Sequence, residues 1–221
     1  MIKLLSFKTR RPDLTPDVFR SHYEEHHVPL GLSFIEHFRW QRYVRNYVAH
    51  PVTGGVPFDC LTEFWVSARA DQERTTRFVG SPEFSVLDAD DRRFLDITRR
   101  LSFEVKEILL SESSSERRPM EMHRLSMFFT KPGATPGTEF AAEIVEGARV
   151  FAAKHRDQFN RITLDLRVAG SLEDDEICAI LSAWPSGVED FEDLAWSEID
   201  PSAPVIMLTS VETAREALFS R

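Results

Sequence analysis

Short runs of alternating apolar and polar residues separate longer segments with helical spacing in the first half of the chain. Such runs predict half-buried strands, because successive side chains of a strand point to opposite faces. The predicted strands are Ile2–Lys8, Gln41–Val48, Asp59–Ser67 and Ser102–Leu110. Helices are expected over Thr15–His27 and about Ala70–Val79, and another should start at Ser81-Pro82. The resulting order, β-α-β-β-α-β, is the ferredoxin-like pattern.

The first predicted helix has signals at both ends. Thr15 is a good N-cap, and Pro16 suits the first helical position. Pro29 biases Val28 away from helical geometry, so we expect the helix to end near His27. The last turn should therefore be irregular, and an ideal helical wheel does not define the directions of its side chains.

The strand and helix pattern restarts in the second half. Leu125-Ser-Met-Phe-Phe-Thr130 followed by Thr135-Pro136 echoes Leu5-Ser-Phe-Lys-Thr9 followed by Thr15-Pro16. Further strands are expected at Arg161–Val168, Ile177–Trp184 and Val205–Val211, and helices at Gly137–His155 and Val188–Trp196. A repeat of this length indicates two ferredoxin-like halves fused in one chain.

A polar segment separates the two predicted halves. Ser111-Glu-Ser-Ser-Ser-Glu-Arg-Arg-Pro119 has no apolar residue, and we interpret residues 111–119 as a linker. The N-terminal repeat then spans residues 1–110, and a degenerate C-terminal repeat spans residues 120–221. We expect an α+β fold in which the helix-free faces of the two sheets pack together as a barrel-like pseudo-dimer.

A histidine-rich run, Tyr23-Glu-Glu-His-His-Val-Pro-Leu30, follows the segment Leu14–Phe19 in the first half. Further motifs occur in order at Arg42–Tyr47, Leu61–Trp65, Ser81–Phe84 and Asp90–Leu95. Together they resemble the EthD family of dimeric α+β barrel proteins over most of residues 1–110. The resemblance implies a ferredoxin-like domain. Where family members are enzymes, it implies cofactor-free decarboxylases, dehydratases, cyclases or lactone isomerases.

The histidines of that run are the main candidates for catalysis. His27 occupies the His-x-Pro position of the family motif, and imidazole titrates near neutral pH, so we expect a general acid or base there. The alternative is a helix-end histidine that caps carbonyls or meets Glu24. An ideal wheel places His26 closer to the shared face of Phe19 and Tyr23, yet we favour His27 because Pro29 perturbs that turn. Tyr23 is the third catalytic candidate.

Five strand residues are candidates for substrate binding: Tyr43, Arg45, Tyr47, Glu63 and Trp65. The tyrosines could orient a substrate oxygen, Arg45 could hold a carboxylate or enolate, and Glu63 could orient a histidine. Each also has a structural interpretation, as aromatic packing, a solvated charge or a salt bridge. Trp65 is explained most simply as a core residue.

The sequence gives little support for a metal or cofactor. His22 and His26 have the i, i+4 spacing of some zinc ligands, but no outlying ligand is evident. Asp90 and Asp91 are interpreted as helix caps rather than catalytic groups. Nucleotide-binding and serine-hydrolase motifs are absent from the sequence, so we expect no cofactor.

Composition limits the location and the partners. The net charge of −9 argues against nucleic acid and anionic membranes. No apolar run reaches the roughly 20 residues of a membrane span, and the chain shows no basic-then-apolar leader. Cys60 and Cys178 lie in apolar runs and are expected to be buried thiols. We expect a cytoplasmic protein with a hydrophobic small-molecule ligand, and the two-repeat chain could itself form a homodimer.

These observations predict an enzyme that moves protons without a cofactor. It would decarboxylate, dehydrate, cyclise or isomerise a hydrophobic intermediate of polyketide-like or aromatic-degradation chemistry, with a tyrosine or arginine holding the enolate oxygen. Two alternatives stay open. One is a non-catalytic accessory or ligand-binding protein of the same pathways, and the other is a haem- or metal-dependent oxidase of a related barrel type.

Overall fold

The computed structural model describes residues 1–113, 121–130, 137–168, 177–186 and 199–219 of the 221-residue chain. The chain divides into two compact units, each made of segments that are discontinuous in sequence. Unit 1 comprises Met1–Tyr47, Pro57–Glu104 and Val211–Arg221, and unit 2 comprises Val48–Val56 and Val105–Ser210.

Unit 1 is built on three antiparallel strands. These are β1 (Ile2–Lys8), β3 (Cys60–Val66) and the first part of β2 (Trp40–Thr53), with β3 in the middle. Glu63 of β3 pairs with Leu5 on one side and Val44 on the other. The start of β4 (Leu101–Glu112) also belongs to this unit.

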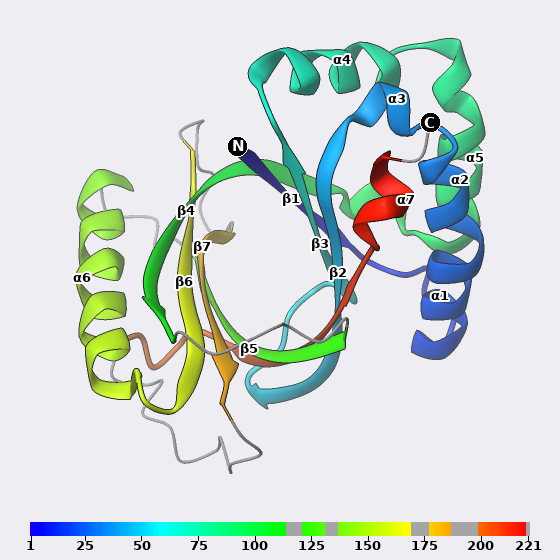
Figure 1. The fold of residues 1–221 in the computed structure, drawn as a ribbon. Coiled ribbons are helices and arrows are strands. Elements are labelled where there is room, and N and C mark those ends of the chain that lie inside the picture. Colours follow the sequence, from blue (N-terminus) through cyan, green and yellow to red (C-terminus); the bar gives the residue numbers. More distant parts are fainter. Residues whose placement is uncertain (114–120, 131–136, 169–176, 187–198, 220–221) are drawn as a thin grey trace. The chain divides into compact units, whose positions relative to one another are not determined.

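Helices cover one face of these strands (Figure 1). In chain order they are α1 (Pro16–His22), the π-helical turn η1 (Tyr23–His27), α2 (Val28–Leu32), α3 (Ile35–Phe38), α4 (Arg69–Val79), the short turn η2 (Pro82–Phe84), α5 (Ser85–Phe94), η3 (Ile97–Arg99) and α7 (Arg215–Phe219). Phe19, Tyr23 and Phe94 from the helices are buried in one cluster with Tyr43 and Cys60 from the strands.

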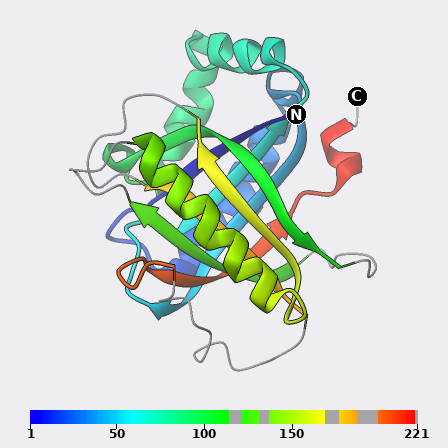
Figure 2. The ribbon, with the colours of Figure 1, turned by 90° about the vertical axis from the view of Figure 1, so that its left-hand side faces the viewer.

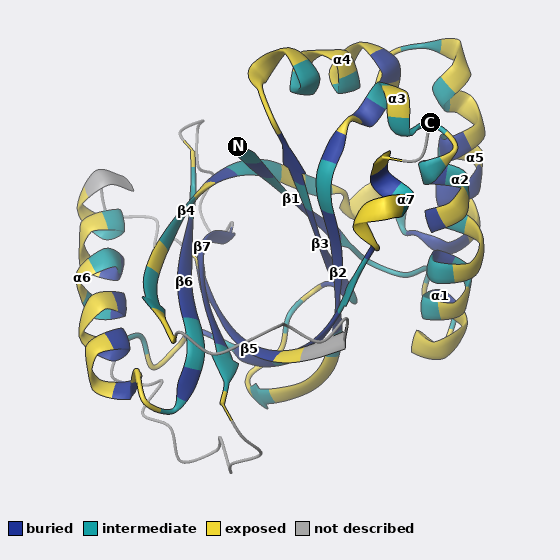
Figure 3. Cartoon of the chain, in the orientation of Figure 1, coloured by how far each residue is buried: buried dark blue, intermediate teal, exposed yellow. Residues whose placement is uncertain are grey.

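Unit 2 pairs a second antiparallel sheet with one long helix. Strand β7 (Ile177–Pro185) lies between β5 (Glu121–Thr130) and β6 (Phe159–Arg167), and β8 (Val205–Glu212) follows in the chain. Helix α6 (Gly137–His155) crosses these strands (Figure 2). It turns a buried stripe towards them and an exposed face away from them (Figure 3). Ala148 and Phe151 of that stripe join the apolar core of the unit.

The hydrogen-bonded strand order is β1-β3-β2-β8-β5-β7-β6-β4, and the order closes on itself. The fold is therefore mixed α and β with a closed barrel of eight strands among the described residues. Both cysteines are buried free thiols, as expected from their apolar surroundings.

Several element boundaries differ from the sequence-based expectation. β2 spans Trp40–Thr53 and so continues beyond Val48, where the predicted strand ends. β4 includes Ser111 and Glu112, the first residues of the predicted linker. The predicted helix Val188–Trp196 and most of that linker lie outside the described residues, whereas α7 was not predicted.

The prediction that the first helix ends near His27 is wrong. The chain stays helical through Pro29, and Val28 has helical dihedrals of φ −62° and ψ −51°. The reason is the π-helical turn η1, in which the N–H of Val28 donates to the carbonyl of Tyr23. This wider turn leaves room for the Pro29 ring, which would clash with the preceding turn of a regular α-helix.

Candidate functional site

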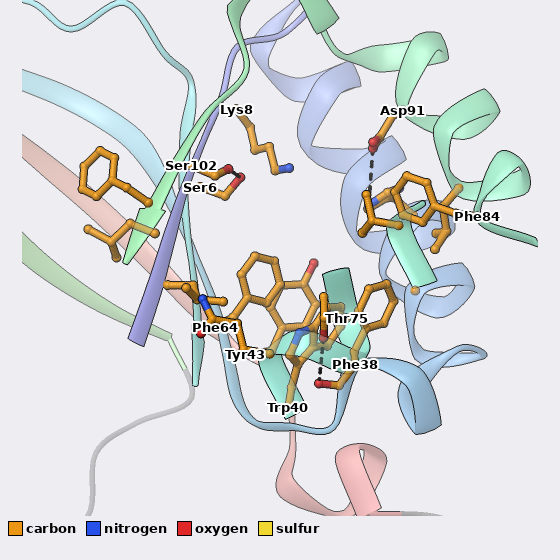
Figure 4. A pocket seen from close by; sticks show the side chains of 18 of the residues that line it. Ser6, Lys8, Phe38, Trp40, Tyr43, Phe64, Thr75, Phe84, Asp91 and Ser102 are labelled. Carbon is orange, nitrogen blue, oxygen red and sulfur yellow. Dashed lines mark hydrogen bonds and ion pairs between the residues drawn. The ribbon is translucent and has the colours of Figure 1, made fainter. Parts of the chain in front are cut away.

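Unit 1 contains a cavity of about 460 Å³ between its strands and its helices. Much of the lining is apolar or aromatic, and its largest feature is an aromatic wall formed by Phe38, Trp40, Tyr43 and Phe64 (Figure 4). The rings of Tyr43 and Phe64 stack with centroids 5.0 Å apart. The polar lining includes Ser6, Lys8, Tyr23, His27, Asp91 and Ser102.

The π-helical turn decides which histidine reaches the cavity. A π-helical turn contains about one residue more than an α-helical turn, so it changes the phase of every side chain that follows. His27 lines the cavity, and its ring lies 5.2 Å from the ring of Tyr23. His26 is exposed and contacts His22 on the outer side, with ring centroids 5.3 Å apart.

Two aspartates of α5 hold the His27 ring. Nδ1 of His27 lies 3.0 Å from Oδ2 of Asp90, and Nε2 lies 3.6 Å from Oδ1 of Asp91. The other oxygen of Asp90 accepts from Nε2 of His22 at 3.0 Å. The interpretation of Asp90 and Asp91 as helix caps is therefore wrong, because both are buried near the end of α5 and face His27.

The position of these aspartates follows from the spacing of α5. Leu87, Asp90, Asp91 and Phe94 are its buried residues, and their i, i+3, i+4, i+7 spacing defines one helical face. Two carboxylates on the buried face of a helix are costly unless they have partners. This spacing is visible in the sequence, and it could have been used to predict that both aspartates face the site.

Burial lowers the pKa of the His27 imidazole below its ordinary value of 6.5, and the carboxylates of Asp91 and Asp90 oppose this effect. At neutral pH the ring is therefore predominantly uncharged. In that state Nδ1–H donates to Asp90, and Nε2 keeps its lone pair for a proton from a ligand. Such a ring can act as a general base.

One buried acceptor beside His27 has no hydrogen-bond partner in the part of the chain that the structure describes. Oδ1 of Asp91 is this atom, and it lies next to Nε2 of His27. The second oxygen of Asp91 accepts from Arg100 at 3.1 Å. Nε2 of neutral His27 and Oδ1 of Asp91 are thus neighbouring acceptors without a donor between them, and they are suited to a ligand that offers a proton.

The tyrosines near the site are held in their neutral form. Burial raises the pKa of Tyr43 and the pKa of Tyr23. The hydroxyl of Tyr23 shares a hydrogen bond of 2.8 Å with Thr62, whereas Tyr43 lines the cavity as part of the aromatic wall. A neutral phenol can donate a hydrogen bond to a ligand oxygen.

Arg45 and Tyr47 face the helices like Tyr43 but do not line the cavity. The Arg45 guanidinium binds Glu24 of η1 through two hydrogen bonds of 3.0 and 2.7 Å, and the Tyr47 hydroxyl donates to the same carboxylate at 2.6 Å. Glu24 is thus occupied by β2 rather than by His27. These bonds tie the π-helical turn to the sheet.

Glu63 and Trp65 also lie outside the cavity lining, because they alternate with Phe64 and point to the opposite face of β3. Glu63 is buried, pairs with Lys3 at 3.3 Å and accepts from Asn46 at 3.1 Å. Cations lie over Trp65, with Lys3 at 4.9 Å from its ring centroid and Arg42 at 4.6 Å.

The described residues contain no group of three or more side chains arranged to hold a metal ion. His22 turns to Asp90 instead of pairing with His26 on a metal. The cavity also does not fit a haem held through histidine. His27 is the histidine in its lining, and both of its ring nitrogens face carboxylates.

The first part of the chain matches a known family. The model of the EthD domain matches residues 11–98, the segment that carries the π-helical turn, the aromatic wall and the two aspartates. Residues 11–98 belong to the EthD family. The EthD segment supplies most of the cavity lining, while β1 and the start of β4 supply the rest.

Several solved structures are similar to this chain at low sequence identity. An anthrone oxidase-like protein is 10% identical, with a TM-score of 0.53, over 96% of this chain and 92% of that protein. A mutant chlorite dismutase from Candidatus Nitrospira defluvii, in complex with cyanide, is 13% identical with a TM-score of 0.47 over 98% and 92%. A haem-binding protein from Thermus thermophilus is 15% identical with a TM-score of 0.43 over 98% and 93%.

No curated protein matches the sequence at a significant level. Among the helices in the described ranges, none is long and apolar enough to cross a membrane.

Proposed function

We propose that the cavity is the active site of an enzyme that catalyses proton transfer without a cofactor. The observation that carries the proposal is the His27 ring in an apolar cavity, oriented by Asp90 and facing the unpartnered oxygen of Asp91. The substrate would be a hydrophobic small molecule with a carbonyl or phenol group. Decarboxylation, dehydration, cyclisation and isomerisation of polyketide-like or aromatic-degradation intermediates all use such parts.

In this proposal Nε2 of His27 accepts a proton from a carbon or oxygen of the substrate. Asp90 keeps the ring in the required tautomer and stabilises the imidazolium that forms. Asp91, 3.6 Å from Nε2, adds to that stabilisation. Tyr43 donates a hydrogen bond to the enolate or phenolate oxygen. A general base of this kind contributes about 10²–10⁴-fold to a rate.

The size and lining of the cavity suit such a substrate. Small-molecule sites commonly enclose about 300–1,000 Å³ and combine apolar walls with a few polar groups. The cavity of about 460 Å³ has this character, because the aromatic wall can hold a flat apolar ring near His27. Arg45 and Tyr47 act through Glu24 by holding the π-helical turn, and Tyr23 packs against the base.

A probe ketone tests the proposal without knowledge of the natural substrate. The enzyme is mixed with 2-tetralone in D₂O, and NMR follows deuterium exchange at the carbon between the ring and the carbonyl. We expect faster exchange than in buffer, and His27→Ala should slow the enzymatic part about a hundredfold. His26→Ala is the matched control, because His26 is exposed, and it should exchange like the wild type.

Full exchange activity in His27→Ala would remove His27 from the mechanism. No acceleration by the wild-type protein would favour the alternative of an accessory, ligand-binding EthD protein, which needs the cavity but no base.

We also propose that the chain consists of two ferredoxin-like repeats. The strand order supports this, because the first four strands are neighbours in the order β4-β1-β3-β2 and the last four in the order β8-β5-β7-β6. An experimental structure in which the two sets of four strands do not superpose would contradict it. The cytoplasmic location and the homodimer stay predictions, to be checked by cell fractionation and light scattering.

A further inference from the structure

A lysine in the cavity has no role in the proton transfer described above. Lys8 is the last residue of β1, and its side chain extends into the cavity towards Asp91 (Figure 4). No hydrogen bond or ion pair joins its ammonium to another side chain within the described ranges. In the nearby carboxylate of Asp91, Oδ2 accepts from Arg100 at 3.1 Å and Oδ1 faces Nε2 of His27 at 3.6 Å. The cation is therefore available to a ligand.

Two hydroxyl groups lie on the same side of the cavity as Lys8. Ser6 shares the cavity-facing side of β1 with Lys8 because the two residues are two positions apart, and its hydroxyl lies 2.7 Å from that of Ser102 on β4 (Figure 4). Two hydroxyls carry two O–H donors, and their mutual hydrogen bond uses one of them. The other can donate to a ligand oxygen.

An anion in this position would relieve an electrostatic cost. Burial lowers the pKa of Lys8 below its ordinary value of 10.5, with Asp91 opposing and Arg100 adding to the effect. The cause is that an ammonium group loses hydration when it is enclosed. A ligand carboxylate would restore a charged partner, and the hydroxyl pair would bind its second oxygen.

We propose that Lys8 and the hydroxyl pair of Ser6 and Ser102 form an anion subsite, and that the ligand of the cavity is an apolar carboxylic acid. Its carboxylate binds Lys8, and its apolar body lies against the aromatic wall. The inference rests on the proposed function in taking this cavity as the ligand site. Beyond the proposed function, it states that the site selects apolar carboxylic acids.

A matched pair of probes tests the subsite. Naphthalene-2-carboxylate and naphthalene-2-carboxamide have nearly the same shape and differ in charge, and calorimetry at low salt gives the affinity of the protein for each. The wild type should bind the carboxylate at least about tenfold more tightly, the scale of one charge pair shielded from water. Lys8→Met should abolish this preference by weakening carboxylate binding, with carboxamide binding unchanged.

Lys106→Met is the control, because Lys106 is an exposed lysine of β4 outside the cavity lining, and it should keep the full preference. Unchanged binding of the carboxamide by Lys8→Met shows that the cavity is still folded. Ser102→Ala should reduce the preference by about threefold, the scale of one hydrogen bond.

Equal binding of the two probes by the wild type, no binding of either probe, or an unchanged preference in Lys8→Met would overturn the subsite. The catalytic proposal fails separately, in the exchange experiment. His27→Ala should keep the preference for the carboxylate even though it loses exchange activity. A wild-type protein with the preference but without exchange activity would be a binding protein for apolar acids.

Discussion

The first helical segment of unit 1 and helix α6 of unit 2 follow the same strand-to-helix pattern, but they use it differently. In unit 1 the helix is interrupted by a π-helical turn that places Tyr23 and His27 at a cavity. In unit 2, α6 is a regular helix whose buried residues include Ala148 and Phe151 in an apolar core. The π-helical turn is therefore one difference between a helix that only packs and one that presents a histidine to a cavity.

Each segment also carries a histidine, and the surroundings of the two rings differ. His155 of α6 is buried, packs against Phe151 with ring centroids 4.6 Å apart, and forms a hydrogen bond of 2.7 Å with the amide oxygen of Gln158. His27 faces two carboxylates and a cavity. A histidine with a neutral partner in a packed core serves stability, whereas one between acids at a cavity has the surroundings that the proposed proton transfer needs.

The largest expected effect separates these two histidines. His27→Ala should slow exchange of 2-tetralone about a hundredfold, because it removes the base, while the protein stays folded. His155→Ala should leave exchange unchanged and destabilise the protein by about 1–2 kcal/mol through lost packing. Exchange NMR and thermal unfolding of both variants check this. If His155→Ala lost exchange activity at a temperature where it is folded, the proposed difference between the roles of the two histidines would be wrong.

Replacing the orienting aspartate should give a smaller effect with its own signature. Asp90→Asn should lower the exchange rate about tenfold or more, because an amide does not stabilise the imidazolium. It should also lower the pKa of His27 further, because Asp90 raises that pKa in the wild type. The acid limb of the pH–rate profile should therefore move to lower pH. A lower rate with an unmoved limb would indicate that Asp90 acts only on packing.

The pH dependence of the wild type should show which form of His27 is active. Its pKa lies below 6.5 because the ring is buried, so the neutral base predominates at pH 7. The exchange rate should fall as the pH drops through the lowered pKa of His27 and should reach a plateau above it. An NMR titration of the His27 ring should give the same midpoint. A rate that rises towards acid pH would contradict the base role.

The smallest effect on activity is expected in unit 2. Ala148 is fully buried in α6, so Ala148→Leu should overpack the core and cost about 1–3 kcal/mol of stability. Exchange at a temperature where the variant is folded should equal that of the wild type. Urea unfolding measures the stability of the variant, and NMR measures its rate of deuterium exchange. A fall in exchange would show that the helix of unit 2 contributes to the site.

Local patterns were enough to predict much of the framework. β1 and α6 have the predicted bounds, because strand alternation and capping residues act within a few positions of the chain. The EthD motifs also identified the family of residues 11–98. The histidine run marked the region of the candidate site, although the ideal wheel favoured His26.

The tertiary structure decided which groups meet. Asp90 and Asp91 lie more than 60 residues after His27, and their contacts with it depend on the packing of α5 against η1. Lys8 enters the cavity because β1 and the helices enclose it together. The π-helical turn brings His27 rather than His26 to the cavity, and it lets the chain stay helical through Pro29. Periodicity describes one element at a time, whereas a cavity is made by side chains from several elements, so packing alone selects its members.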